Sequence, residues 1–298
     1  MRILVTGATG FIGRKLLEGI KDPVVLSRNP DKAQTPLARG KAFRWDPLAG
    51  EPPREAFDGV EAVIHLAGEP VAEGRWTAAK KQRIMESRKV GTTNLVRAIC
   101  DLPNPPRVLV SASAIGIYGD RGDEPLEERS APGKDFLADV CREWEAAADP
   151  ARERGVRVVH PRIGIVLGAG GGALAKMITP FKFGLGGRLA SGRQWMSWIH
   201  VDDMVGMLLF AVNNEHASGA MNAVSPTPVT NSDFTRALAA AVHRPAIFPV
   251  PGFALRLLLG EFAQILLASQ RVLPRAAEKA GYGYLYPDLQ AALRSIVE

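Results

Sequence analysis

The sequence has few cysteines and no long hydrophobic run, and each shortage excludes a class of protein. Cys100 and Cys141 are its only cysteines, which argues against a disulfide scaffold or a zinc site and favours a reducing, cytoplasmic location. We therefore expect no bound metal. No apolar stretch reaches the ~18 residues that a bilayer span requires. The nearest candidate, 252–268, is interrupted by Arg256 and Glu261, and we interpret it as a largely buried helix rather than a membrane-surface helix.

Basic clusters interleaved with aromatic residues are also lacking, although the net charge is +6 and the pI is about 9.5. The lysines and arginines are dispersed, which argues against nucleic-acid binding and favours a basic surface with an anion-binding pocket. Met1 and Arg2 lead directly into an apolar run, so no signal peptide is expected. The expected partner is a small molecule, not nucleic acid or a membrane. The oligomeric state stays open, with a homodimer as one option.

The first thirteen residues, MRILVTGATGFIG, contain the most informative pattern. The apolar run 3–5 lacks polar alternation, which is typical of a parallel strand buried on both faces. Glycines follow with a G-x-x-G-x-x-G spacing, and a helical pattern then continues to Ile20. Such a turn lets the backbone approach a pyrophosphate, which the free N–H groups of the helix N-terminus attract. We expect dinucleotide contacts from Gly7, Thr9, Gly10, Phe11, Ile12 and Gly13.

The end of the next apolar run, 24–26, indicates which dinucleotide binds. An acidic residue at this position would hydrogen-bond the ribose 2′-hydroxyl of NAD and repel a 2′-phosphate. The chain instead has Ser27 and Arg28. The planar guanidinium suits a phosphate group, and the serine adds a hydroxyl donor. Lys32 is a further source of positive charge, so the sequence predicts NADP as the cofactor.

The glycine spacing and the segment HLAG at 65–68 resemble extended short-chain dehydrogenases/reductases of the NAD-dependent epimerase/dehydratase type. The resemblance implies an α/β fold, a Rossmann-like doubly wound parallel sheet with a small C-terminal substrate lobe. It implies that the backbone of 66–68 runs along the cofactor, whereas His65 is interpreted as structural. A helix residue, Arg88, would either touch the cofactor or support the residues that do. The further cofactor contacts implied are Leu66, Ala67, Gly68, Arg88 and Val166.

The resemblance places catalysis in the segment SASAIGIYG, 111–119, and in a Y-x-x-x-K helix that follows it. In the family a serine or threonine bonds the substrate oxygen, and the tyrosine, held near the lysine, transfers the proton. Ser113 and Tyr118 are the candidates within this segment. Ser113 lies one residue away from the usual hydroxyl position, which Ala114 occupies.

The helix that would carry the Tyr–Lys pair departs from the family pattern. It has Leu137 where the tyrosine belongs and Cys141 where the lysine belongs. No tyrosine occurs between Tyr118 and Tyr282, so a shifted register cannot restore it. Because leucine cannot transfer a proton, any chemistry requires another group or a water. Cys141 itself and Glu69 are further candidates.

The C-terminal half begins with glycine-rich loops after residue 168, which are typical of segments that cover a substrate. The run 193–203, RQWMSWIHVDD, resembles a strand-to-helix segment of the same family. Asp202 or Asp203 is expected to cap the following helix, and Asn231 or Ser232 the next one. Side chains in this run are candidates for an anionic substrate, with the tryptophans either stacking on it or filling the core: Arg193, Trp195 and Trp198.

Residues 249–293 resemble the C-terminal domain of one subfamily of uncharacterised "epimerase family" proteins. We expect an NADP-binding domain in 1–170 that also takes in about 195–225, and a substrate lobe with a C-terminal helical region in 171–298. One hypothesis is an NADP-dependent oxidoreductase or epimerase that acts on a small polar, nucleotide-linked or free, substrate. The alternative is a non-catalytic NADP-binding protein with a regulatory or redox-sensing role.

Overall fold

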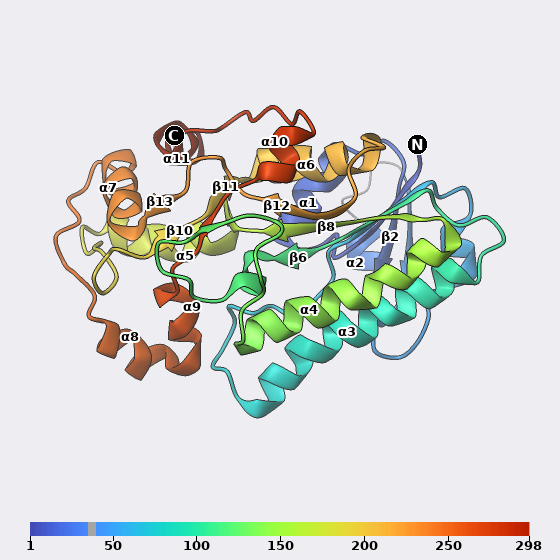
Figure 1. The fold of residues 1–298 in the computed structure, drawn as a ribbon, viewed down its shortest axis with the longest axis horizontal. Coiled ribbons are helices and arrows are strands. Elements are labelled where there is room, and N and C mark those ends of the chain that lie inside the picture. Colours follow the sequence, from blue (N-terminus) through green and yellow to red (C-terminus); the bar gives the residue numbers. More distant parts are fainter. Residues whose placement is uncertain (35–39, 298) are drawn as a thin grey trace.

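The computed structural model describes residues 1–34 and 40–297 and shows a sheet between layers of helices (Figure 1). Among these residues, the main sheet has the strand order β12-β8-β5-β4-β1-β2-β3, and β6 also pairs with β8. All of these pairings are parallel. The strands are β1 Ile3–Thr6, β2 Pro23–Ser27, β3 Lys41–Arg44, β4 Ala62–His65, β5 Val108–Ser111, β6 Ser113–Ala114, β8 Arg157–Ile163 and β12 Gly219–Ala223.

Both faces of the sheet are buried, which explains the apolar runs without alternation. Val5 belongs to one hydrophobic cluster, together with Met204, whereas its neighbour Leu4 belongs to the opposite cluster, together with Leu95. The first cluster lies under α1 and α6, and the second under α3 and α4 (Figure 1). The helices of these layers are α1 Phe11–Glu18, α2 Pro30–Gln34, α3 Ala78–Cys100, α4 Phe136–Ala148 and α6 Val201–Asn213, with short 3-10 turns η1 Arg54–Phe57, η2 Ile115–Tyr118 and η3 Asp149–Arg154.

The strand order reverses beside β1, as expected for a doubly wound sheet. β1 pairs with β2 on one side and with β4 on the other, so the chain leaves β1 and β4 toward opposite edges. In such sheets the ligand crevice lies outside the carboxyl ends of the strands at this switch point. The residues predicted to contact the cofactor follow these same strand ends.

The remaining elements form a lobe beyond the carboxyl ends of the strands (Figure 1). Its hydrophobic core includes Trp198, Phe234 and Leu293. Of the segment 195–225 assigned to the first domain from the sequence, β12 joins the main sheet, whereas its first strands pair within the lobe. The elements here are β7 Pro125–Leu126, β9 Ile165–Leu167, α5 Gly172–Lys182, β10 Trp195–Met196, β11 Trp198–His200, β13 Val229–Thr230, α7 Asn231–Ala241, α8 Gly252–Leu259, η4 Gly260–Phe262, α9 Ala263–Leu267, β14 Arg271–Val272, α10 Arg275–Lys279 and α11 Leu289–Val297.

Two helix caps differ from the sequence prediction. The residue before α6 is His200, whose Nδ1 accepts a hydrogen bond from the N–H of Asp202 (3.1 Å). Asp203 instead turns to the C-terminal segment, where its carboxylate accepts bonds from the backbone N–H groups of 285 and 286. The cap of α7 is Thr230 rather than Asn231 or Ser232. In both cases an earlier side chain, two residues before Asp202 and one before Asn231, accepts a bond from the free N–H groups.

The segment 252–268 is not the largely buried helix that its apolar composition predicted. It forms α8, η4 and α9, and Gly260, with a φ of 60°, ends α8. Phe253, Leu257 and Leu258 are 74%, 76% and 67% exposed. Within the described part of the chain, no helix combines the length and apolarity needed to cross a bilayer.

Candidate functional site

The first glycine turn forms a cradle that only backbone can line. Gly7 has a φ of 70°, and a Cβ added there would lie 2.7 Å from the carbonyl carbon of Leu66. A Cβ at Gly13 would lie 2.2 Å from the carbonyl oxygen of Gly7, which brings α1 close to the turn. No side chain caps α1, and its first internal bond runs from Arg14 N to Gly10 O (2.9 Å). The N–H groups of residues 11–13 therefore remain available, and this arrangement fits a pyrophosphate.

The predicted 2′-phosphate site lies where β2 ends. Ser27 hydrogen-bonds both backbone groups of Asn29, so its hydroxyl supports the turn. Arg28 is exposed, and no bond engages its guanidinium within the described ranges 1–34 and 40–297. Arg44, which was not predicted as a cofactor contact from the sequence, also belongs to this region. The parallel register pairs it with Ser27, and its Nη1 donates to the Arg28 backbone carbonyl (3.2 Å), so a second guanidinium lies at the same strand end.

The segment 66–68 lies against β1, and the Arg88 side chain packs against it. The Arg88 Nη1 donates to the carbonyl of Glu69 (3.0 Å), and its guanidinium stacks on the Trp144 ring at 4.8 Å. A Cβ at Gly68 would lie 3.1 Å from the guanidinium carbon. Burial lowers the pKa of Arg88. Of the two roles considered for Arg88, the structure favours support of the cofactor-lining backbone.

The glycine-rich loop after Val166 packs on the start of α1. A Cβ at Gly168 would lie 2.8 Å from the Phe11 ring, and one at Gly171 would lie 2.3 Å from it. Larger residues at 168 and 171 would therefore displace the ring. Val166 is buried in β9 beside this contact. The loop thus has a packing reason for its glycines, in addition to the flexibility inferred from composition.

His65 is structural, as expected. Its ring is fully buried, with Nδ1 2.7 Å from the Thr6 hydroxyl and Nε2 3.0 Å from the Thr92 hydroxyl. Burial lowers the pKa of His65 to about 3, with a smaller contribution from the positive charge of Arg88. The ring is therefore neutral at physiological pH and joins β1, β4 and α3.

Ser113 and Tyr118 belong to one buried polar network. The Ser113 hydroxyl donates to Glu145 (2.7 Å), and Glu145 accepts two bonds from Arg162 at 2.9 and 3.0 Å. Arg162 also donates to the Tyr118 oxygen (2.9 Å), and Tyr118 donates to Asn222 (2.6 Å). Tyr118 has no exposed surface, and burial raises its pKa. This arrangement argues against the catalytic role predicted for Tyr118, because its hydroxyl is bonded inside the core.

The helix α4 presents apolar groups where the family has its proton-transfer pair. A Cβ at Gly116 would lie 3.3 Å from Cβ of Leu137 and 3.9 Å from Sγ of Cys141. Both side chains therefore face the segment that follows Ser113. Burial raises the pKa of the Cys141 thiol to about 11, although Arg88 opposes the shift. The thiol is protonated at neutral pH and is a poor nucleophile and base.

An ion pair between Lys80 and Glu69, which the sequence did not predict, lies directly after the cofactor-lining segment. The Lys80 ammonium, buried in the first turn of α3, donates to the Glu69 carboxylate (2.7 Å). Arg83 adds a longer contact of 3.4 Å to the same oxygen. The bond from Lys80 holds the pKa of Glu69 below its usual range. The two residues are eleven positions apart, so sequence spacing did not reveal the pair.

The loop after Glu69 connects this region to the lobe. Trp76 packs edge-on against Phe136 at 5.4 Å and against Phe262 at 6.2 Å. The Arg75 guanidinium donates to the carbonyl of Leu257 (3.2 Å) at the end of α8. The ion pair between Lys81 and Glu261 adds a further link. The motif GRW at 74–76 therefore fixes the lobe against the first domain.

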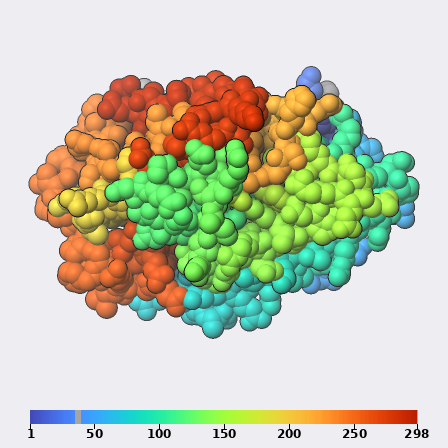
Figure 2. Space-filling model, viewed as in Figure 1, coloured from blue at the N-terminus to red at the C-terminus, as the bar shows by residue number. Residues whose placement is uncertain are grey.

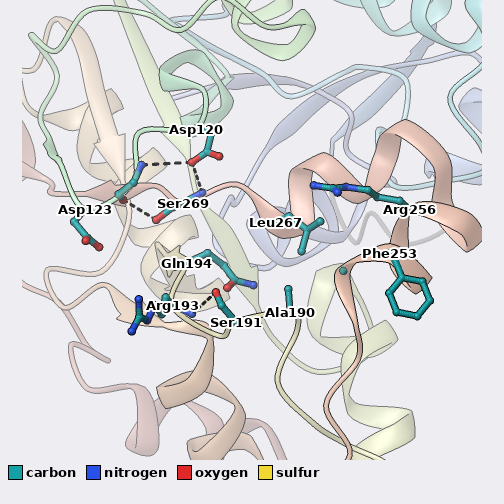
Figure 3. Close-up of a pocket in the computed structure, with 12 residues that line it drawn as sticks. Asp120, Asp123, Ala190, Ser191, Arg193, Gln194, Phe253, Arg256, Leu267 and Ser269 are labelled. Carbon is teal, nitrogen blue, oxygen red and sulfur yellow. Dashed lines mark hydrogen bonds between the residues drawn. The ribbon is translucent and has the colours of Figure 1, made fainter.

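A pocket of about 490 Å³ lies in the lobe and contains one of the predicted substrate residues (Figure 3). Arg193 lines it, and Arg256 and Phe253 approach from α8. Trp195 lies beside it, with its Nε1 bonded to Asp123 (2.8 Å) and one ring face covered by the Arg271 guanidinium at 4.5 Å. The other lining residues are Asp120, Gly122, Asp123, Ala190, Ser191, Gln194, Gly252, Leu267 and Ser269.

Trp198, the third predicted substrate residue, does not reach this pocket. It has no exposed surface, and its Nε1 donates to the Thr227 carbonyl (3.0 Å). Of the two alternatives for this tryptophan, stacking on a substrate or filling the core, its position agrees with the second. Its place in β11 directs alternate side chains inward, and a bulky aromatic residue is suited to that interior.

The family models and solved structures agree with this arrangement. Residues 3–224 match the NAD dependent epimerase/dehydratase family, and residues 250–296 match a domain of unknown function, DUF1731. An Arabidopsis thaliana protein, "Epimerase family protein SDR39U1 homolog, chloroplastic", is 42% identical over 100% of this chain and 87% of its own length. These matches agree with the subfamily resemblance inferred from the C-terminal segment.

Two solved structures superpose on the whole chain. Human epimerase family protein SDR39U1, crystallised with NADPH, has a TM-score of 0.89 and 34% identity, covering 100% of this chain and 99% of the human one. A nucleoside-diphosphate sugar epimerase from Corynebacterium glutamicum has a TM-score of 0.79 and 34% identity, covering 100% of this chain and 58% of its own. The cofactor predicted from Ser27 and Arg28 is the one bound in the human structure. The chain therefore belongs to the NAD-dependent epimerase/dehydratase family.

Proposed function

We propose that this chain binds NADPH in the crevice beside β1 and acts as an oxidoreductase or epimerase on a small polar substrate. The observation that carries the cofactor assignment is the pair of guanidiniums, Arg28 and Arg44, beside a strand end without an acidic residue. Two cations suit the dianionic 2′-phosphate, which NADH lacks. The NADPH-bound human relative supports this assignment.

Different segments of the first domain would contact different parts of NADPH. The N–H groups at the start of α1 would hold the pyrophosphate, and the backbone of 66–68 would lie along the ribose. Val166 would lie at the nicotinamide end. When bound, NADPH would supply the hydride that defines the reaction class. The glycine contacts at 7 and 13 leave room for this path.

The substrate would extend toward the lobe pocket. Arg193 and Arg256 line that pocket, and neither guanidinium has an ion-pair partner in the described part of the chain. Free guanidiniums favour an anionic group such as a phosphate or carboxylate. A nucleotide-linked sugar would provide one, and the Corynebacterium relative is a nucleoside-diphosphate sugar epimerase.

Proton transfer would require a group outside α4. Glu69 follows the cofactor-lining segment, and its carboxylate is partly exposed and oriented by Lys80. We infer that the Lys80–Glu69 pair moves the proton that the missing tyrosine would have moved. Ser113 is less suited, because its proton is donated to Glu145.

A non-catalytic function has a specific observation in its favour. The polar groups around α4 are internally bonded, and Leu137 and Cys141 replace the proton-transfer pair. In this alternative the chain would bind NADPH for a regulatory or redox-sensing purpose. The two functions share the cofactor site and differ only in turnover.

The deciding experiment measures NADPH oxidation with a panel of small polar carbonyl compounds and, because epimerisation consumes no net cofactor, formation of the epimer from sugar nucleotides in the presence of NADP+. Both are compared for the unmodified chain and Glu69→Gln. The proposal predicts turnover of at least one compound and a loss of about 100-fold in kcat in the variant, with NADPH affinity retained. Glu18→Gln, at an exposed carboxylate on α1, is the matched control. Tight NADPH binding without turnover of any compound would favour the non-catalytic function.

A further inference from the structure

The lobe exposes a group of large hydrophobic side chains at one end of the molecule. Each is more than half exposed, and all come from the end of α5, the strand-like segment before α8, and α8 itself. Figure 2 shows these segments, yellow and orange, together at the left end. The group, called the apolar patch below, consists of Phe183, Leu185, Ile247, Phe248, Phe253, Leu257 and Leu258.

Backbone contacts join the three segments into one surface. Phe248 N donates to the Gly186 carbonyl (3.3 Å), and Leu189 and Val250 form a parallel bridge. A Cβ at Gly252 would lie 3.4 Å from Cβ of Ala190, so the start of α8 touches the same strip. Residues 183–190 therefore run beside 247–252, and the apolar side chains form neighbouring parts of one face.

The segments that carry the patch have charges of a single sign. No aspartate or glutamate occurs in 154–201 or in 234–260, which contain all of the patch residues. The same segments carry exposed cations, namely Lys176, Lys182, Arg188, Arg244 and Arg256. Beyond these segments, Asp120 and Asp123 line the pocket beside α8, and Glu261 is paired with Lys81. These segments thus carry large apolar side chains and cations without any acidic residue, and the five cations are called the rim cations below.

We propose that the apolar patch docks on an anionic lipid surface. Large exposed patches on soluble folds mark interaction sites, and an apolar face flanked by lysine and arginine matches the headgroup boundary of an anionic bilayer. A second copy of the chain fits less well. In a two-fold interface the patch would meet itself, and the rim cations would face like charges. This inference departs from the sequence expectation of no membrane partner and does not depend on the proposed enzymatic function.

The patch has the geometry of a peripheral contact rather than an insertion. In α8, Phe253 and Leu257 are four residues apart and share one helix face, and Arg75 fixes the end of the helix from the first domain. The apolar side chains would enter the headgroup boundary while the rim cations contact lipid phosphates. Binding would depend on both anionic lipid and ionic strength.

The test is co-sedimentation of the whole chain with vesicles of phosphatidylcholine alone or with about one-third phosphatidylglycerol. We expect binding only to the anionic vesicles, weakening as salt increases. Ile247→Ser combined with Leu257→Ser should reduce partitioning by at least about tenfold, since two large apolar side chains no longer leave water. Lys182→Ser should reduce it by about fivefold.

Matched controls lie elsewhere on the surface. Leu285 is 70% exposed, so Leu285→Ser removes comparable apolar area outside the patch, and Lys21→Ser removes an exposed charge far along the chain from it. Both controls should bind vesicles like the unmodified chain. NADPH titration of every variant checks that it is folded. Absence of vesicle binding, equal loss in the controls, or patch variants that only convert a dimer to a monomer would each overturn the proposal.

Discussion

The glycine turn and the region around α4 differ in how many of their polar groups are free to hydrogen-bond a ligand. At the first glycine turn, the N–H groups of α1 are uncapped and the Arg28 guanidinium is exposed. Around α4, the Ser113 hydroxyl and the Tyr118 hydroxyl are both bonded within the core. The groups at the glycine turn are available to bind a ligand, whereas the groups around α4 stabilise the fold. The comparison teaches that a family's cofactor cradle can persist where its proton-transfer pair has been replaced.

Changes to the closed network should alter stability and leave cofactor affinity unchanged. Arg162→Met removes the buried partner of Glu145 and a donor to Tyr118, so the free energy of unfolding should fall by about 3–5 kcal/mol. Denaturant unfolding measures this effect, and NADPH titration measures affinity. The control is Arg236→Met at an exposed ion pair with Asp233, where the loss should stay below about 1 kcal/mol. Equal losses at the two sites would contradict the account.

The buried ring of His65 predicts a pH dependence of stability. Its pKa is lowered from 6.5 to about 3, so the unfolded chain binds a proton that the folded chain excludes between these values. The stabilisation is complete above the unfolded pKa and is lost as the pH falls, by about 1.4 kcal/mol per unit. Chemical unfolding between about pH 6 and pH 4 measures the slope. His65→Gln should reduce it, and an unchanged slope would assign the dependence to other groups.

A methyl group in the glycine cradle should weaken both stability and binding. In Gly13→Ala the new Cβ would lie 2.2 Å from the Gly7 carbonyl oxygen, so α1 must shift, at a cost of about 1–3 kcal/mol. Gly283→Ala is the matched control, because its Cβ would meet no atom within 4 Å. Thermal unfolding and NADPH titration report the two effects. Unimpaired NADPH binding by Gly13→Ala would break the link between the cradle and the pyrophosphate.

The smallest expected effect separates the two cofactors. Arg28→Ala and Arg44→Ala should each weaken NADPH binding by about tenfold, because each removes one cation from the 2′-phosphate. NADH affinity should not change, since NADH lacks that phosphate. Arg28→Ala should also leave stability unaffected, because Arg28 makes no side-chain bond among the described residues. A parallel loss for both dinucleotides would place these arginines elsewhere in the site.

The sequence predicted the elements whose determinants are local. The strand 3–5 and the glycine turn follow from an apolar run and glycine spacing within a few residues, and the family resemblance implied the helix that spans 136–148. Arg44 was missed because only the pairing of β3 with β2 brings it to Ser27. The burial of Tyr118 was not predicted for a similar reason, since the partners of its hydroxyl are the distant residues Arg162 and Asn222.

The remaining differences also depend on contacts between distant segments. Asp203 was expected to cap α6, yet its carboxylate serves the backbone at 285 and 286, more than eighty residues later. The segment 252–268 is apolar enough for a core, but the lobe leaves one face of α8 uncovered. Composition measures how apolar a segment is, and only the packing of the whole chain decides which side is covered.

The central claim is that the open end of the crevice binds NADPH although the family's proton-transfer pair is absent. Titration of the unmodified chain with NADPH and with NADH, followed by nicotinamide fluorescence, tests it most directly. The account predicts saturable NADPH binding that is at least about tenfold tighter than NADH binding. Equal affinity for the two dinucleotides, or no saturable binding of either, would contradict it.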